Sequence, residues 1–287
     1  MADKYILVPI DFSEHSYRAA QVAVRVAERM AVPQITFLHA CAKGQMNLAD
    51  QLIEFNNRLL KDIESAGIAT VRFSFQVAPG VPEEVIKVYA SQNEPSLIVM
   101  ATRSKAQKQQ DMIGSVCAEF IERTEWPVLV VPAQVPVQRI LTPSHVAYST
   151  SFSQRDISEL DDMMRVLNYR SNNGQTGLSL SFVHIRHTTD AAQLQQRIDS
   201  LKSYMQLGFP DVDFSIHILD KPEHQSGELR LIEDGMALFN TLQNFLVTYN
   251  IDLLTIKNSK RGLFSRLFVD STAKKLINEG NIAMLVM

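Results

Sequence analysis

The residues in this chain that are best placed to do chemistry lie in a loop between an apolar strand and a helix. The segment 96–101, SLIVMA, predicts a buried strand, and Gly114 and Ser115 predict the start of the next helix. The first N–H groups of a helix lack partners within it and lie at the positive end of its dipole, so they can hold a phosphate group. Arg103 and Lys105 add positive charge to the loop. These residue types in this order indicate a phosphate site.

The same segment occurs a second time at the end of the chain. Residues 96–131 and 252–287 align at a constant offset of 156 residues (96 to 252), and each copy reads as strand, polar loop, helix opened by a serine, and strand. In the second copy Asp270 precedes Ser271, where the first copy has glycine. A carboxylate there would repel a phosphate, so only the first copy predicts a phosphate site.

The first half of the chain alternates strands with amphipathic helices. Apolar runs without internal alternation predict strands that are buried on both faces, which is typical of a parallel sheet covered by helices. The predicted strands are 4–10, 35–41, 71–77, 96–101 and 128–132, and the predicted helices are 15–30, 46–66, 82–91 and 114–123. Ser13 is expected to cap the first helix, Gly67 to end the second, and Pro82 to begin the third. We expect a doubly wound, Rossmann-like α/β domain with a five-stranded parallel sheet.

The second half repeats this order of elements. Its predicted strands are 139–143, 178–185 and 212–219, followed by the two apolar strands of the repeated segment 252–287, and its predicted helices are 152–169, 190–207, 228–248 and 271–279. A short proline-containing linker separates the halves. The sequence therefore predicts two domains of one fold class, residues 1–133 and 138–287, which pack together as an intrachain pseudo-dimer.

In a doubly wound sheet, ligands bind beyond the carboxyl ends of the central strands. Four pieces of the first domain converge there: the ends of the first, second and fourth strands, and the start of the last helix. The residues expected to line this crevice are Asp11, Ala40, Ala101, Ser104, Gly114, Ser115 and Val116. An aspartate in that place could accept hydrogen bonds from a ribose, and the helix start could hold the phosphates.

The chain resembles a universal stress protein in tandem form, with two copies of that family's domain. The resemblance rests on the segment VPIDFS around Asp11 and on the Gly114–Ser115 pair. Nucleotide-binding members of that family carry an aspartate after the first strand and the pattern G-x-x-G-x9-G-[S/T] after the fourth. The resemblance implies ATP, in company with Mg, as the ligand of the first domain. It also implies that the final VLVV strand pairs domains, within the chain and in a homodimer.

The chain departs from the family pattern at both early glycines. The pattern reads Ala101-x-x-Ser104-x9-Gly114-Ser115 in the first half. A serine in the left-handed conformation costs roughly 1–2 kcal/mol, about one order of magnitude in affinity. Two readings follow: a weakened nucleotide site, or a vestigial crevice in which Gly114 serves helix packing.

The second half has lost nearly all of the pattern. It reads Lys257-x-x-Lys260-x9-Asp270-Ser271, and the segment 142–145, interpreted as the end of its first strand, has no aspartate. We therefore expect the second domain not to bind nucleotide through the family's site.

Composition excludes several other classes of protein. The 287 residues carry a net charge of −3 with a sequence pI near 6.2, which argues against a nucleic-acid partner or an anionic membrane. No apolar run reaches the length of a membrane span, and the N-terminus does not read as a signal peptide. We expect a cytoplasmic protein whose protein partners the sequence does not name.

Three further features have simpler interpretations than a functional one. Cys41 and Cys117 read as small buried residues rather than redox sensors, although Cys117 lies near a helix start. His39 and His184 occupy matching strand ends and are expected to bond to the backbone rather than to a metal. The basic and aromatic stretch 260–268 is expected to pack beneath its loop rather than to contact a membrane.

Three functions remain open. The first is a regulatory stress-response protein that senses ATP in its first domain and catalyses no reaction. The second is an interaction module of the same fold without a ligand. The third is a slow ATPase of the adenine-nucleotide α-hydrolase class, but the glycine-rich loop of such enzymes is missing from residues 9–13, PIDFS. No nucleophile–base pair or carboxylate dyad supports an enzyme.

Overall fold

The computed structural model describes residues 4–42, 48–68, 71–102, 116–117, 119–121, 124–167, 177–186, 191–220, 230–257 and 282–287. The chain divides into two compact units. The first contains residues 1–141 and 277–286, and the second contains residues 142–276 and the final residue. The last strand of the chain therefore belongs to the first unit, although it follows the second unit in sequence.

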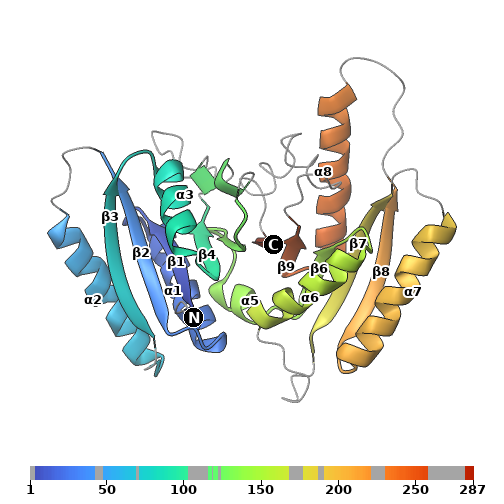
Figure 1. Ribbon diagram of the computed structural model, residues 1–287, viewed down its shortest axis with the longest axis horizontal. Coiled ribbons are helices and arrows are strands. Elements are labelled where there is room, and N and C mark those ends of the chain that lie inside the picture. Colours follow the sequence, from blue (N-terminus) through green and yellow to red (C-terminus); the bar gives the residue numbers. More distant parts are fainter. Residues whose placement is uncertain are drawn as a thin grey trace. The chain divides into compact units, whose positions relative to one another are not determined.

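The first unit is built on a parallel sheet (Figure 1). Its strands are β1 (Tyr5–Ile10), β2 (Gln34–Cys41), β3 (Arg72–Pro79), β4 (Leu97–Ala101) and β5 (Val128–Val131), joined by β10 (Ala283–Val286). Its helices are α1 (Glu14–Arg29), α2 (Ala49–Ser65), α3 (Pro82–Asn93) and α5 (Val137–Leu141). The first five strands are parallel in the order β3-β2-β1-β4-β5, as the doubly wound prediction requires, and β10 runs antiparallel beside β5.

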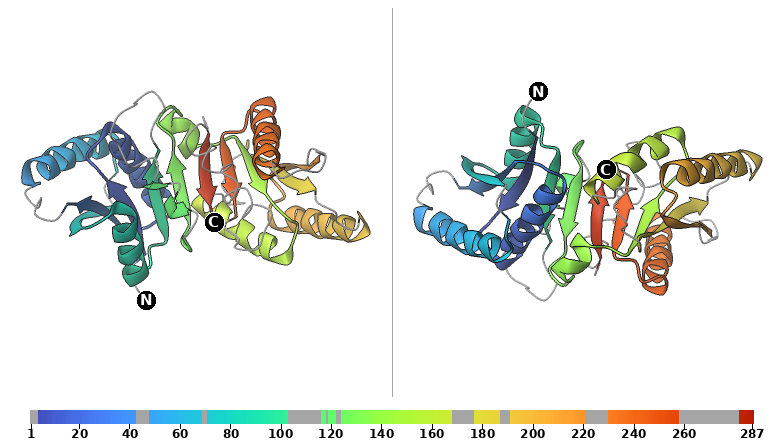
Figure 2. Two further views of the ribbon diagram at one scale, coloured as in Figure 1. Left: turned by 90° about the horizontal axis from the view of Figure 1, so that it is seen from above. Right: turned by 90° about the horizontal axis from the view of Figure 1, so that it is seen from below.

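Helices cover both faces of this sheet. Figure 2 shows α1 and α2 on one side of the strands and α3 on the other. The core between α2 and the sheet is aromatic: the fully buried ring of Phe37 stacks on Phe75 at 5.2 Å and meets Phe55 edge-on at 5.6 Å. Such pairs add to the free energy gained by burial.

The ends of α1 and α2 follow from single residues. Ser13 precedes α1 in an extended conformation, and its hydroxyl accepts a hydrogen bond from the N–H of Ser16, which satisfies an otherwise unpaired helix donor. Beyond the end of α2, Gly67 adopts a left-handed φ of 67°, a conformation that costs glycine little. Both were predicted from the sequence, and both are confirmed.

The pairing of β5 with β10 has the register expected of two copies of one strand. Leu129 faces Leu285, Val130 faces Met284, and Val128 faces Val286. Leu129 and Leu285 are also 156 residues apart (285 − 129), the offset of the sequence repeat. A self-complementary pairing of equivalent residues is the pattern of an isologous contact.

The second unit repeats the strand order. Its elements are β6 (His145–Ser149), α6 (Gln154–Val166), β7 (Ser179–Arg186), α7 (Ala191–Gly208), β8 (Asp213–Asp220), α8 (Arg230–Thr248) and β9 (Leu253–Ile256). Among its described residues, four parallel strands are ordered β9-β6-β7-β8. Helices α6 and α7 lie on one side of these strands and α8 on the other (Figure 2). The last apolar segment of the chain, expected as the fifth strand of this half, is β10 of the first unit, so a five-stranded sheet in the second domain remains a prediction.

The predicted first strand of the second half, 139–143, is wrong. Residues 137–141 form the short helix α5, and the strand β6 lies at 145–149. Pro136 accepts the first hydrogen bonds of α5, and Pro143, which has no backbone N–H, separates the helix from the strand. The register confirms the new match, because Ile6 of β1 and Val146 of β6 pair with Leu97 and Leu253, which are equivalent in the repeat.

Candidate functional site

A pocket opens in the first unit at the carboxyl ends of β1, β2 and β4. Asp11, Ala40, Ala101 and Val116 all line it, so residues expected to converge from four segments of the sequence do lie around one space. Its apolar wall is formed by Pro9, Ile10, Leu38, Pro82, Ile86 and Met100, and its polar groups come from Ser13, His15 and Ser16. Ser104, Gly114 and Ser115 lie outside the described residues. A mostly apolar wall with a few polar groups is typical of small-molecule sites.

The carboxylate of Asp11 is held at the start of α1. Its Oδ1 accepts hydrogen bonds from the Ser13 N–H at 3.1 Å and from the Ser13 hydroxyl at 2.5 Å, and the hydroxyl of Ser16 accepts one from the Asp11 N–H at 3.3 Å. Between them, Phe12 takes a left-handed φ of 62°, which turns the chain sharply from strand to helix. This turn fixes a half-buried carboxylate at the rim of the pocket.

A histidine ties the ends of β1 and β2 together beside this turn. His39 Nδ1 lies 2.9 Å from the carbonyl oxygen of Ile10, and since a carbonyl only accepts, Nδ1 carries the proton. The ring also packs on Phe12, with centroids 4.7 Å apart. His184 repeats the arrangement with the carbonyl of Thr150 at 2.9 Å and the ring of Phe152. The expectation that both histidines bond to the backbone is confirmed.

The second unit places a similar turn after β6, not at 142–145. Phe152 has a left-handed φ of 57°, and Ser153 caps α6, so Phe152 and Ser153 correspond to Phe12 and Ser13 at an offset of 140 residues (152 − 12). The residue that matches Asp11 is then Ser151. The place that matches Asp11 therefore has no aspartate, but it lies at Ser151 and not within residues 142–145.

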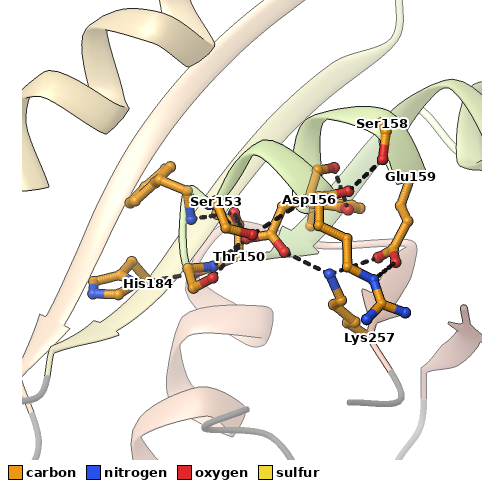
Figure 3. Close-up of polar contacts among 11 residues, drawn as sticks. Thr150, Ser153, Asp156, Ser158, Glu159, His184 and Lys257 are labelled. Carbon is orange, nitrogen blue, oxygen red and sulfur yellow. Dashed lines mark hydrogen bonds and ion pairs between the residues drawn. The ribbon is translucent and has the colours of Figure 1, made fainter. Parts of the chain in front are cut away.

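A carboxylate nevertheless lies at this turn, supplied by the helix instead of the loop. Asp156 Oδ2 accepts hydrogen bonds from the N–H of Ser151 at 2.8 Å and of Ser153 at 3.0 Å, and from the hydroxyls of Ser151 and Thr150. Its other oxygen, Oδ1, lies 2.8 Å from Lys257 Nζ (Figure 3). Asp156 corresponds to Ser16, so serine and aspartate have exchanged places between the two units.

The carboxyl group of Asp156 should make the free energy of unfolding depend on pH. Burial raises the pKa of its carboxyl, but hydrogen bonds from Lys257, Ser151 and Ser153 outweigh burial and lower the pKa from 3.8 to about 2. A pKa lowered by folding stabilises the fold above pH about 4, by about 2 kcal/mol, and this contribution is lost as the pH falls through about 2. Urea unfolding of the wild type and of Asp156→Asn should therefore differ most near neutral pH and converge in acid. A difference that is independent of pH would contradict the assignment.

The two cysteines are buried, and Cys117 has no accessible surface. Burial raises the pKa of the Cys117 thiol to about 12. The thiolate is the reactive form, so Cys117 is poorly suited to redox sensing despite its place near a helix start. The stretch 260–268 lies outside the described residues.

Two kinds of structure are absent from the described part of the chain. No group of three or more His, Cys, Asp or Glu side chains there could hold a metal ion. No helix in the same ranges is long and apolar enough to cross a membrane.

Comparisons with known proteins agree with this geometry. Residues 4–132 match the model of the universal stress protein family, and no curated protein sequence matches the chain. A universal stress protein from Archaeoglobus fulgidus DSM 4304 superposes with a TM-score of 0.63 at 19% identity, over 99% of this chain and 96% of that one. A putative universal stress protein from Pseudomonas aeruginosa UCBPP-PA14 gives a TM-score of 0.61 at 12% identity, over 100% and 93%. At such identities these two likenesses show the fold of the whole chain, and the family match rests on its first half.

Proposed function

We propose that this chain is a regulatory protein of the universal stress type in tandem form, and that its first unit binds an adenine nucleotide. The observation that carries the proposal is the pocket of the first unit. Asp11, Ala40, Ala101 and Val116 come from four separate segments and line one space at the carboxyl ends of the central strands. That is where doubly wound sheets hold nucleotides.

Each part of the proposed site has a role that its chemistry suits. The Asp11 carboxylate accepts hydrogen bonds from the ribose, and the backbone near Ala40 faces the base. The N–H groups at Gly114, Ser115 and Val116 with the Ser115 hydroxyl hold the phosphates of ATP, to which Mg would be bound. Ala101 and Ser104, in place of glycines, weaken the site without closing it.

The proposed protein acts by binding rather than by turnover. Nucleotide occupancy of the first unit would alter the surface presented to protein partners, and chains would pair further into homodimers in the cytoplasm. An enzyme would need a base and a nucleophile within reach of the phosphates. The hydroxyl of Ser13, which lines the pocket, instead donates to Asp11 Oδ1 and accepts from the N–H of Ser16.

The proposal is tested on protein purified without added nucleotide. Small molecules released by denaturation are separated by anion exchange, and an adenine nucleotide is expected among them. The variant Asp11→Asn should bind the nucleotide about 10- to 100-fold more weakly than the wild type, since a hydrogen bond to a charged acceptor contributes about 1.5–3 kcal/mol. Asp50→Asn, at an exposed position at the start of α2, is the matched control. No released nucleotide, together with no binding of added Mg-ATP, would refute the proposal.

A further inference from the structure

Two small residues that line the open pocket of the first unit have charged counterparts in the second unit. Ser16 and Ala101 line the pocket of the first unit. At the offsets of 140 and 156 residues, their equivalents are Asp156 (16 + 140) and Lys257 (101 + 156). A small hydroxyl and a methyl group in the first unit are thus replaced by a carboxylate and a long ammonium side chain.

These two side chains meet, together with a third, beside the start of α6. Lys257 follows directly after β9, and its Nζ lies 2.8 Å from Asp156 Oδ1 and 3.0 Å from Glu159 Oε2 (Figure 3). Glu159 is also paired with Arg155 through Nε at 3.0 Å. Two carboxylates and two cations therefore balance in charge at this place.

The cluster is largely shielded from water. The side chains of Asp156, Lys257 and Glu159 are 4%, 14% and 19% exposed. Charges removed from water to this extent are costly unless paired with good geometry, and Asp156 meets that condition because Oδ2 accepts four further hydrogen bonds. Surface ion pairs contribute little by comparison. An ammonium group that is shielded from water and held between two carboxylates is a fixed part of the fold rather than a passing contact.

We propose that Lys257 is an internal ligand of the second unit. Its side chain fills the crevice that stays open in the first unit, and its ammonium group binds the carboxylates of Asp156 and Glu159 in place of a soluble molecule. The second unit is therefore complete without a ligand, and its stability does not respond to nucleotide. This inference holds whether or not the first unit binds nucleotide.

The first test removes the charge and keeps the bulk. Lys257→Met should lower the unfolding midpoint of the full chain by roughly 6–15 °C, since it leaves the shielded carboxylate of Asp156 without a cation and Glu159 with only the exposed Arg155. Arg165→Met is the matched control, because Arg165 pairs with Asp162 on the exposed side of α6 and should shift the midpoint little. Equal shifts in the two variants would overturn the proposal.

The second test empties the crevice and refills it. Lys257→Ala removes the atoms of a propylammonium ion, so n-propylammonium chloride should raise the midpoint of this variant. Tetramethylammonium chloride at the same ionic strength has no N–H donor and should not. Restoration by neither cation, or by both equally, would show that the ammonium group is not held as a ligand.

The third test copies the first unit at positions 156 and 257 and neutralises Glu159. The triple variant Asp156→Ser, Glu159→Gln, Lys257→Ala carries no uncompensated carboxylate at the crevice. It should not respond to n-propylammonium, because the carboxylates that would bind the cation are gone. A triple variant that responds to the cation as strongly as Lys257→Ala does would overturn the proposal.

Discussion

Replacing Asp156 with alanine is expected to lower the free energy of unfolding by about 3–5 kcal/mol, the range for removing one partner of a buried ion pair. The change removes the acceptor of four hydrogen bonds at the start of α6 and leaves Lys257 paired with Glu159 alone. It also removes the reciprocal cap with Ser153 that begins the helix. Urea unfolding followed by circular dichroism measures the loss.

The matched control for this variant lies on the same helix. Asp162→Ala removes a carboxylate whose partner, Arg165, is 63% exposed, so the expected loss is below about 1 kcal/mol. If the two alanine variants lose similar stability, the Asp156 cluster is no more than a surface ion pair.

Transferring the second unit's ion pair to the first should abolish nucleotide binding. The double variant Ser16→Asp, Ala101→Lys places the carboxylate and the ammonium at the equivalent positions, both of which line the pocket. The lysine side chain would occupy the space of the ligand, and we expect at least a roughly 100-fold loss of affinity for Mg-ATP, about 2.7 kcal/mol. Calorimetric titration of the apo protein measures it.

A second double variant separates occupancy of the pocket from a change of charge. Val88→Lys with Gln92→Asp adds the same two charges at exposed positions one turn apart on α3 and should leave affinity unchanged. Affinity of Ser16→Asp, Ala101→Lys within about twofold of the wild type would mean that nucleotide binds elsewhere.

Local signals in the sequence were sufficient for most of the fold. Continuous apolar runs gave the parallel strands, and Ser13, Pro82 and Gly67 marked helix ends, because each acts through its own backbone or the neighbouring turn. The convergence of Asp11 and Ala101 followed from topology, since parallel strands bring their carboxyl ends to one edge of the sheet.

The first strand of the second half could not be placed by apolar pattern alone. A short apolar run such as Ile140–Leu141 suits a helix or a strand equally well, and the structure makes it helical. One signal was available: the pair Phe152–Ser153 repeats Phe12–Ser13, and aligning these pairs would have moved the strand to 145–149.

The pairing of Asp156 with Lys257 was beyond the reach of motif comparison. The two residues are 101 positions apart and meet only because β6 and β9 are neighbours in the sheet. Comparison with the family pattern shows only that Lys257 replaces a glycine of the nucleotide site, which predicts the loss of that ligand. Only the side-chain geometry shows what stands in the ligand's place.

The central claim is that one unit keeps an open nucleotide crevice and the other is filled from within. The most direct measurement is the stoichiometry of Mg-ATP binding to the nucleotide-free full chain, by calorimetry with protein concentration determined independently. We expect one nucleotide per chain in the wild type and none in the double variant Ser16→Asp, Ala101→Lys. Two nucleotides per chain, or none, would contradict it.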